Sequence, residues 1–343
     1  MAIIDKPSDY FNTVLYTGNG STQSITSLDF QPDLNWTKQR NVSQDHTLTD
    51  SIRGVGKLLF SSDTAAEYTD VNSLTSFNSD GFSVGTSGYM NTSSNTYASW
   101  NWLANGTGVA NTDGDIASTV SANTTSGFSI VSYTGNGSTN QTIGHGLGVE
   151  PDFIIIKARS TTMNWPTYQK VMGNGVVFLD VTDAWASGGG YDNYWYTSGM
   201  TSSTFGISDN INTNTSSATF IAYCFAEKQG YSKFGSYTGN GDADGTFVYT
   251  GFKPAFVMVK PTSTADNWVM FDNKRDINNV NSKYLYANRN YAEGTDDLID
   301  FTSNGFKQRS SGGTANGSGT TYIYMAIAEN PFVTSTGVPA TAR

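Results

Sequence analysis

The sequence contains few of the residue types that build catalytic and metal sites. Its 343 residues include one cysteine and two histidines, and charged residues make up 14% of the chain, against roughly 25% in an ordinary globular protein. One cysteine excludes an intrachain disulfide. Two histidines leave little material for a Ser-His-Asp triad or a histidine-rich metal site. We therefore expect no enzyme, no catalytic residues, no metal site and no cofactor.

Positive charge and long apolar runs are also scarce. The net charge is −10 and no run of Lys or Arg occurs, so a surface that tracks nucleic-acid phosphates is not expected. No window approaches the roughly 18 apolar residues of a membrane span. The first ten residues carry charges at Asp5, Lys6 and Asp9 and lack the apolar centre of a signal peptide. We expect neither nucleic-acid binding nor membrane insertion.

Aromatic residues and turn formers are abundant. Phe, Trp and Tyr reach 13% and glycine occurs 36 times, among many Ser, Thr and Asn residues. Aromatic and β-branched side chains pack well on pleated sheets, and Gly and Asn adopt the conformations that turns need. The composition therefore predicts an all-β fold.

The pentapeptide Tyr-Thr-Gly-Asn-Gly occurs three times, beginning at Tyr16, Tyr133 and Tyr237. Asn-Gly supplies the positive φ of a tight turn, so each copy predicts an opening β-hairpin. Other features recur in register behind it. A proline follows each copy, and a lysine stands six residues after the proline on a strand that the proline opens; the pairs are Pro32 with Lys38, Pro151 with Lys157, and Pro254 with Lys260.

Fourteen residues after the proline, the second and third copies have Trp165 and Trp268, and the first has His46. We therefore interpret His46 as the occupant of an aromatic core position and not as a catalytic histidine. Each copy ends on an aromatic strand at residues 96–102, 219–225 and 321–327. The second and third of these strands are apolar on both faces and are predicted at the centre of a packed sheet.

This register predicts three tandem β-sandwich domains, of jelly-roll or lectin-like type, with extended terminal arms. The second and third are expected to pack as a pair, because the connection between them is short. The predicted boundaries are an N-terminal arm 1–10, repeat 1 at 11–104, a Gly/Ser/Thr/Asn-rich linker 105–126, repeat 2 at 127–229, repeat 3 at 230–330 and a C-terminal tail 331–343.

Candidate binding residues lie where the three copies differ. Tyr191, Tyr194, Trp195 and Tyr196 follow three glycines in repeat 2. A flat aromatic set could stack on a sugar ring or anchor a protein interface, and core packing is the alternative interpretation. The other polar groups considered are read as loop residues: His145, Asp180 with Asp183, Asp296, Asp297 and Asp300, Asn111 with Asp113 and Asp115, and Asp242 with Asp244.

Several phrases resemble a family of repeat-bearing proteins from tailed bacteriophages, marine and cyanobacterial ones in particular. They are the segments 128–137, 144–148 with Pro151, 223–227 and 235–241, the start at 5–11 and the end at 331–343. Members of this family are tail-fibre-like or virion structural proteins. The resemblance implies a virion location, host-surface attachment, and contacts with other virion proteins through the terminal arms. It also implies a homo-oligomer.

Two alternative functions remain open at this point. A capsid decoration protein would carry its arms across several capsid subunits. A glycan-binding or glycan-cleaving module would use host polysaccharide as its ligand.

Overall fold

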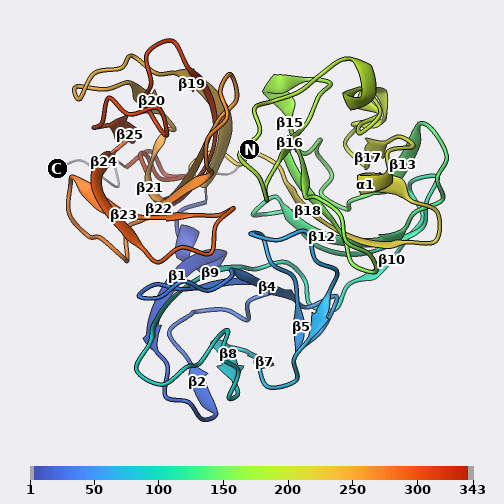
Figure 1. Ribbon diagram of the computed structural model, residues 1–343, viewed down its shortest axis with the longest axis horizontal. Helices are drawn as coiled ribbons and strands as arrows, with labels where there is room; N and C mark the ends of the chain where they lie inside the picture. The colour runs from blue at the N-terminus through green and yellow to red at the C-terminus, as the bar shows by residue number, and fades with distance from the viewer. Residues whose placement is uncertain (1–3, 339–343) are drawn as a thin grey trace.

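The computed structural model describes residues 4–338. Their regular secondary structure is nearly all β and is arranged in several sheets (Figure 1). Three lobes surround a common centre, and each contains one of the repeats. They are named here unit 1 (11–104), unit 2 (105–229) and unit 3 (230–330). Helical turns are short. They are Pro7–Asp9, Lys170–Met172, Gly189–Tyr191, Thr197–Gly199 and α1 (Ile211–Asn214).

Unit 1 contains a four-stranded antiparallel sheet in the order β1-β9-β3-β4, together with two smaller sheets in the orders β2-β8-β7 and β5-β6. The strands are β1 (Phe11–Thr17), β2 (Gln23–Ile25), β3 (Leu34–Gln39), β4 (Thr47–Asp50), β5 (Lys57–Leu58), β6 (Tyr68–Thr69), β7 (Leu74–Asn78), β8 (Gly81–Val84) and β9 (Thr96–Trp102).

Unit 2 is organised around a seven-stranded sheet in the order β10-β11-β12-β18-β14-β15-β16, and β13 pairs with β17. The strands are β10 (Val109–Asn111), β11 (Ser118–Asn123), β12 (Phe128–Thr134), β13 (Gln141–Gly144), β14 (Phe153–Ala158), β15 (Pro166–Gln169), β16 (Val177–Phe178), β17 (Thr204–Ile207) and β18 (Thr219–Phe225).

Unit 3 is one eight-stranded sheet in the order β19-β26-β21-β22-β23-β24-β25-β20, which curls nearly into a barrel. The strands are β19 (Ser232–Thr238), β20 (Phe247–Tyr249), β21 (Phe252–Pro261), β22 (Val269–Asp272), β23 (Asn281–Tyr286), β24 (Gly294–Thr302), β25 (Gly305–Gln308) and β26 (Thr321–Pro331).

The two strands predicted at the centre of a sheet, β18 and β26, each lie between two hydrogen-bonded neighbours, which confirms that prediction. β9 of unit 1 has the same position in its sheet. The strands that follow each proline are β3, β14 and β21. In unit 3 the strand begins before the proline, and register shifts on either side of Pro254 accommodate the missing N–H.

The Tyr-Thr-Gly-Asn-Gly copies do not form hairpins, which corrects the prediction. The strands before the motif, β1, β12 and β19, pair with β9, β18 and β26. The strands after it, β2, β13 and β20, pair with β8, β17 and β25. The motif therefore carries the chain from one layer of the unit to the other.

The three large sheets share one central core. One face of each sheet contributes to it, so Trp100, Tyr223 and Met325 from the three central strands belong to the same buried cluster. A separate outer cluster lies within each unit. Units 2 and 3 pack together as predicted, but unit 1 shares the core equally with them and is not the more independent unit that was expected.

The segment 105–126, predicted as a linker, instead forms β10 and β11 at the edge of the unit 2 sheet. The described part of the N-terminal arm packs against the body, and Ile4 is buried in the central core. The backbone N–H of Ser335 in the C-terminal tail donates to the Asp5 carboxylate over 2.6 Å. Predicted arm residues 1–3 and 339–343 lie outside the described residues. No helix within residues 4–338 is long and apolar enough to cross a membrane.

Candidate functional site

The aromatic cluster that the sequence suggested as a binding site is divided between core and surface. Tyr194 and Trp195 are buried in the outer core of unit 2. Their ring centroids lie 5.6 Å from Phe178 and 5.4 Å from Tyr168, respectively.

Tyr191 is 43% exposed and stacks over Tyr194 at 6.4 Å, and Tyr196 is half-buried. The four residues therefore do not present one flat aromatic face, and Tyr191 is the exposed member.

Two of the other polar candidates, His145 and Asp180, have structural partners. His145 is buried, its Nδ1 accepts from Leu147 N–H, and its Nε2 lies 3.2 Å from the Thr201 carbonyl oxygen. The Asp180 carboxylate accepts from Asn164 Nδ2 and from the backbone N–H of Trp165. Within residues 4–338 no group of three or more His, Cys, Asp or Glu side chains is placed to hold a metal ion.

The aromatic position after each proline joins neighbouring units. Trp165 Nε1 of unit 2 donates to the Asp63 carbonyl of unit 1, and Trp268 Nε1 of unit 3 donates to the Phe178 carbonyl of unit 2. His46 of unit 1 makes the corresponding contact with unit 3.

His46 Nε2 lies 3.0 Å from the Tyr286 carbonyl oxygen of unit 3, and its Nδ1 accepts from Trp36 Nε1 at 2.9 Å. Because a carbonyl oxygen only accepts, Nε2 carries the proton and the ring is neutral. The interpretation of His46 as the occupant of an aromatic position agrees with this placement.

The repeated lysine is buried in every unit, and in units 2 and 3 it crosses a boundary between units. Lys157 Nζ donates to the carbonyls of Thr64 in unit 1 and Met163, each at 2.8 Å. Lys260 Nζ donates to Thr182 of unit 2 at 2.9 Å and to Asp266 at 2.7 Å. Burial lowers the pKa of Lys38, Lys157 and Lys260 to about 8. All three lysines are buried. Lys157 and Lys260 join neighbouring units, whereas Lys38 Nζ donates to the carbonyls of Gln39 and Val42 within unit 1.

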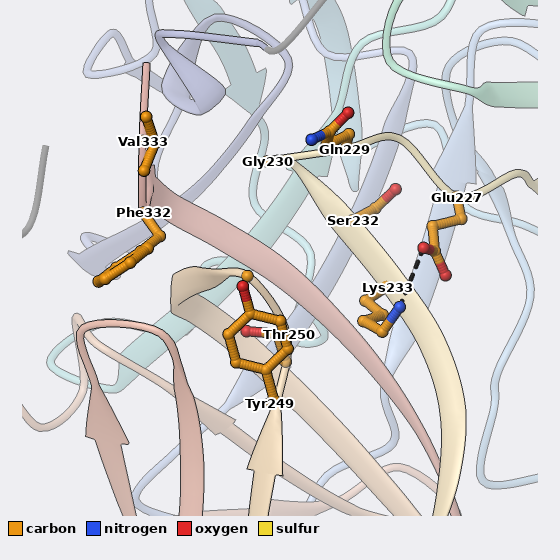
Figure 2. Close-up of a pocket in the computed structure, with 10 residues that line it drawn as sticks. Glu227, Gln229, Gly230, Ser232, Lys233, Tyr249, Thr250, Phe332 and Val333 are labelled. Atoms are coloured by element: carbon orange, nitrogen blue, oxygen red, sulfur yellow. Dashed lines mark hydrogen bonds and ion pairs between the residues drawn. The ribbon is translucent and has the colours of Figure 1, made fainter. Parts of the chain in front are cut away.

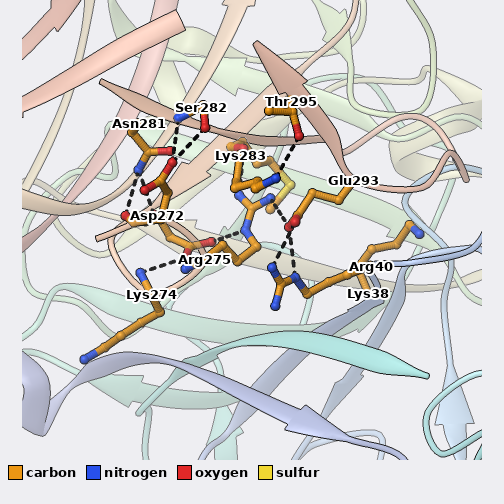
Figure 3. A network of polar contacts seen from close by, with 12 residues as sticks. Lys38, Arg40, Asp272, Lys274, Arg275, Asn281, Ser282, Lys283, Glu293 and Thr295 are labelled. Atoms are coloured by element: carbon orange, nitrogen blue, oxygen red, sulfur yellow. Dashed lines mark hydrogen bonds and ion pairs between the residues drawn. The ribbon is translucent and has the colours of Figure 1, made fainter. Parts of the chain in front are cut away.

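Units 3 and 1 are also joined by buried charges (Figure 3). Glu293 accepts two bonds of 2.9 Å from Arg40, and Arg275 Nη1 lies 3.4 Å from the same carboxylate. Arg275 Nε is 2.5 Å from Asp272, which also accepts from Trp100 Nε1 of unit 1 at 3.0 Å.

Units 1 and 2 repeat the arrangement. Glu67 accepts from Arg159 at 2.9 and 3.2 Å, and Arg53 Nη1 lies 3.4 Å away. Arg53 Nε is 2.5 Å from Asp50, and the Tyr223 hydroxyl of unit 2 donates to Asp50 at 2.8 Å.

The boundary between units 2 and 3 has the same backbone geometry and different side chains. One backbone hydrogen bond marks the equivalent position at all three boundaries, and its pairs are Glu293 N to Arg40 O, Glu67 N to Arg159 O and Trp185 N to Thr262 O. At this third boundary Gln169, Met172, Trp185 and Thr262 replace the charged residues, and Met172 and Trp185 pack against the central core. All four charged positions are therefore uncharged at this boundary. Replacing only one member of an ion pair would leave the other charge buried and unpaired.

A groove of about 400 Å³ lies on unit 3 and is named here the unit 3 groove (Figure 2). It lies between the start of β19, the turn from β20 to β21, and the residues that follow β26. Tyr249 is 57% exposed beside it, and Phe332 lies across from Tyr249. Lys233 and Glu227 form an ion pair of 3.0 Å at the rim.

A second groove of about 300 Å³ runs beside β1 of unit 1 and is named here the unit 1 groove. Val14 and Leu15 of β1 line it together with Ser27 and with Lys274 from unit 3. Both grooves combine apolar side chains with the edge of a sheet. Such a surface can stack on a sugar ring or accept an extended polypeptide. Sequence reasoning missed both grooves, because their walls come from residues far apart in the chain.

The fold and these contacts define a class of protein: an all-β body of three related units locked around one core. The chain belongs to a family of domains of unknown function, DUF7483, whose family model matches residues 6–331. No curated protein matches the chain.

Proposed function

We propose that the chain is a non-enzymatic structural protein of a bacteriophage particle, of the tail-fibre or appendage kind, which displays β-sandwich units for attachment to the host surface. The observation that carries the proposal is the central core shared by all three units. A body in which three lobes cannot move independently holds exposed loops at fixed separations. Fixed separation allows several weak contacts to act together on one surface.

The division between repeated and variable residues supports the same proposal. The lysine of units 2 and 3, the aromatic position of all three units and two of the three boundary networks hold the units together. Large exposed side chains occur where the repeats differ, among them Tyr191 in unit 2 and Ile277 in unit 3, which is 83% exposed. The two terminal arms meet through Asp5 and Ser335, so we propose that one region of the surface makes the contacts with other virion proteins. A homo-oligomer is part of this proposal.

Quantitative mass spectrometry and immunogold microscopy of purified phage particles test the proposal. We expect the protein on the tail or an appendage, in a copy number similar to that of other tail proteins. Label over the head in a copy number close to that of the capsid subunit would favour the capsid decoration alternative. Absence from purified particles would overturn the virion role.

The exposed ring of Tyr249 favours one second candidate, a glycan-binding module. In that case the intact protein would bind host polysaccharide, and Tyr249→Ala would weaken binding by about tenfold, because stacking on one aromatic ring contributes about 1 kcal/mol or more. Tyr291→Ala is the matched control on another tyrosine of similar exposure. Release of shortened oligosaccharides would contradict the non-enzymatic assignment.

A further inference from the structure

The three units differ at one edge of their large sheets. In unit 2 the edge of β12 is covered by β11, which pairs with it over six residues. The corresponding strands β1 and β19 are the outermost strands of their sheets. The unit 1 groove and the unit 3 groove lie beside these two uncovered strands.

The grooves occupy the position that β11 fills in unit 2. Gly146, Ser27 and Tyr249 each stand five residues before the proline of their unit. A Cβ on Gly146 would lie 3.0 Å from Val120 and 3.2 Å from Ala122, so β11 packs directly on this position. Ser27 lines the unit 1 groove and Tyr249 lines the unit 3 groove.

The segment around β11 closes unit 2 by contacting both of its layers. Val120 lies opposite Val131 of β12. Ile116 forms a parallel bridge with Ile143 of β13, and its N–H donates to the Thr142 carbonyl at 3.0 Å. Ile116 and Val120 both belong to the outer core. In unit 3 the corresponding strands β19 and β20 are the two ends of the curled sheet, and the unit 3 groove lies between them.

Both uncovered strands present backbone groups to the open side. Gly239 N–H donates to the carbonyl oxygen of Thr320, just before β26, and Gly18 N–H donates to the carbonyl oxygen of Asn95, just before β9. Since successive residues of a strand alternate in direction, Phe234 and Ser236 of β19, and Thr13 and Leu15 of β1, direct their N–H and C=O groups away from the sheet. No charged residue stands within β1, although edge strands usually carry charge that prevents pairing with other chains.

We propose that β1 and β19 are docking sites for an extended segment of a partner protein, which adds to each sheet as an antiparallel strand in the way that β11 adds to β12. The chemistry of the partner follows from β11 and its approach: small and β-branched side chains directed into the groove, alternating with Ser, Thr or Asn. A free segment fits better than the edge strand of a second copy, because the occupant enters between two strands of different layers.

The docking proposal is based on the comparison of the three units and not on a location in the virion. Absence of the protein from phage particles would overturn the virion role but not the docking proposal. Failure of strand docking would not contradict the virion role.

A synthetic peptide covering residues 115–124 is the probe, added in trans to the intact protein. We expect saturable binding, with NMR shift changes at β19 and β1. The matched peptide carries Ser121→Pro, because the N–H of residue 121 faces β12 in unit 2. We expect the proline peptide to bind about tenfold more weakly or not at all, since it loses one ladder bond and gains a steric clash.

Variants of the protein locate the binding edge. Ser236→Pro and Leu15→Pro remove N–H groups on the open side, where proline is tolerated, and Ser236→Ala and Leu15→Ala retain them. Each proline should abolish the shift changes at its own edge, and circular dichroism checks that the variant is folded. Tyr249→Gly reproduces the residue found in unit 2 at an exposed position, so it should tighten peptide binding at β19.

Three outcomes would overturn the proposal. One is the absence of binding at millimolar peptide to both the native protein and the Tyr249→Gly variant. Another is binding that the proline variants leave unchanged. The third is self-association that the proline variants abolish without any peptide binding, which would identify a second copy as the occupant.

Discussion

His46 places a titratable ring inside the central core, next to Lys38, Arg275 and Trp36. Burial, followed by the charge of Lys38, lowers the pKa of His46 well below 6.5. A proton on Nδ1 would oppose the Trp36 N–H at 2.9 Å. Below pH 6.5 the unfolded chain binds a proton that the folded protein excludes, so this contribution to stability is complete above pH 6.5 and declines as the pH falls.

We expect the free energy of unfolding to fall by up to about 1.4 kcal/mol per pH unit below 6.5 from this residue alone. The double variant Trp36→Met with His46→Trp reproduces the pair Met258 and Trp268 of unit 3 and removes the titration. Urea unfolding at pH 7 and pH 5 compares the two proteins. If both proteins lose the same free energy of unfolding between pH 7 and pH 5, His46 does not contribute to the pH dependence of stability.

The carboxylate of Glu293 is shared by Arg40 and Arg275, whose guanidinium groups are mostly or fully buried. We expect Glu293→Gln to lower the free energy of unfolding by about 3 kcal/mol, because it leaves the mostly buried Arg40 without its counter-ion and removes one of the two carboxylates that face Arg275. Lys170→Gln removes a more exposed ion pair with Glu150 and should change stability by less than about 1 kcal/mol. Similar losses from the two variants would contradict this account of the network.

At the scale of elements, the Tyr-Thr-Gly-Asn-Gly motif holds the two layers of each unit together. Its tyrosine stacks on the first aromatic residue of the closing strand, with ring centroids 4.8, 5.1 and 4.9 Å apart in units 1, 2 and 3. A Cβ on the first glycine would lie within 2.4 Å of a carbonyl oxygen in every copy, and the second glycine has φ between 70° and 72°. One buried asparagine fixes the loop in each unit: Asn91, Asn214 and Asn316.

We predict that Asn316→Ala destabilises the protein by about 2 to 4 kcal/mol, because several buried groups lose their partners. Asn316 Nδ2 donates to Asn240, Asp242 and Ser310 at 2.8 to 2.9 Å, and its Oδ1 accepts from Asn240 N–H. Chemical denaturation measures the loss, with the exposed Asn278→Ala as the control. If Asn316→Ala loses no more stability than the control, the glycines and the tyrosine stack, and not Asn316, fix the conformation of the loop.

Elements with a local signal could be predicted from the sequence. The strands after Pro32 and Pro151 and the three closing strands carry their own apolar pattern. The hairpin prediction was wrong because Asn-Gly specifies a turn but does not specify which strand pairs with the strand after it. Long-range hydrogen bonds, such as those of Asn91, decide that pairing. β11 was missed because Val120 is its only large apolar residue, and backbone pairing with β12 supplies the rest. Tyr194 and Trp195 could not be separated from Tyr191 without knowing which ring faces the core.

At the scale of the whole molecule, sequence repetition suggested three independent domains, and the central core argues against that independence. The inner faces of the sheets carry large apolar residues, among them Trp268, Phe256 and Phe153, that are buried only when the units are together. Buried charges also cross the boundaries, so separating one unit would expose apolar surface and leave Arg or Glu without partners. The sequence repeats therefore mark where each unit begins and ends in the chain, but they do not mark separate folding units.

We therefore predict a single unfolding transition for the intact chain, with calorimetric and van't Hoff enthalpies that agree. An isolated segment 230–330 should be unfolded or aggregated, because its face with Phe256 and Trp268 would be exposed to water. The segment 127–229 without β10 and β11 should behave in the same way, since Phe153 and Trp165 lie on its central face. Differential scanning calorimetry of the intact protein and circular dichroism of the segments measure these outcomes. Separate transitions, or an isolated unit that melts at the temperature of the whole chain, would instead establish three autonomous domains that only touch at their inner faces.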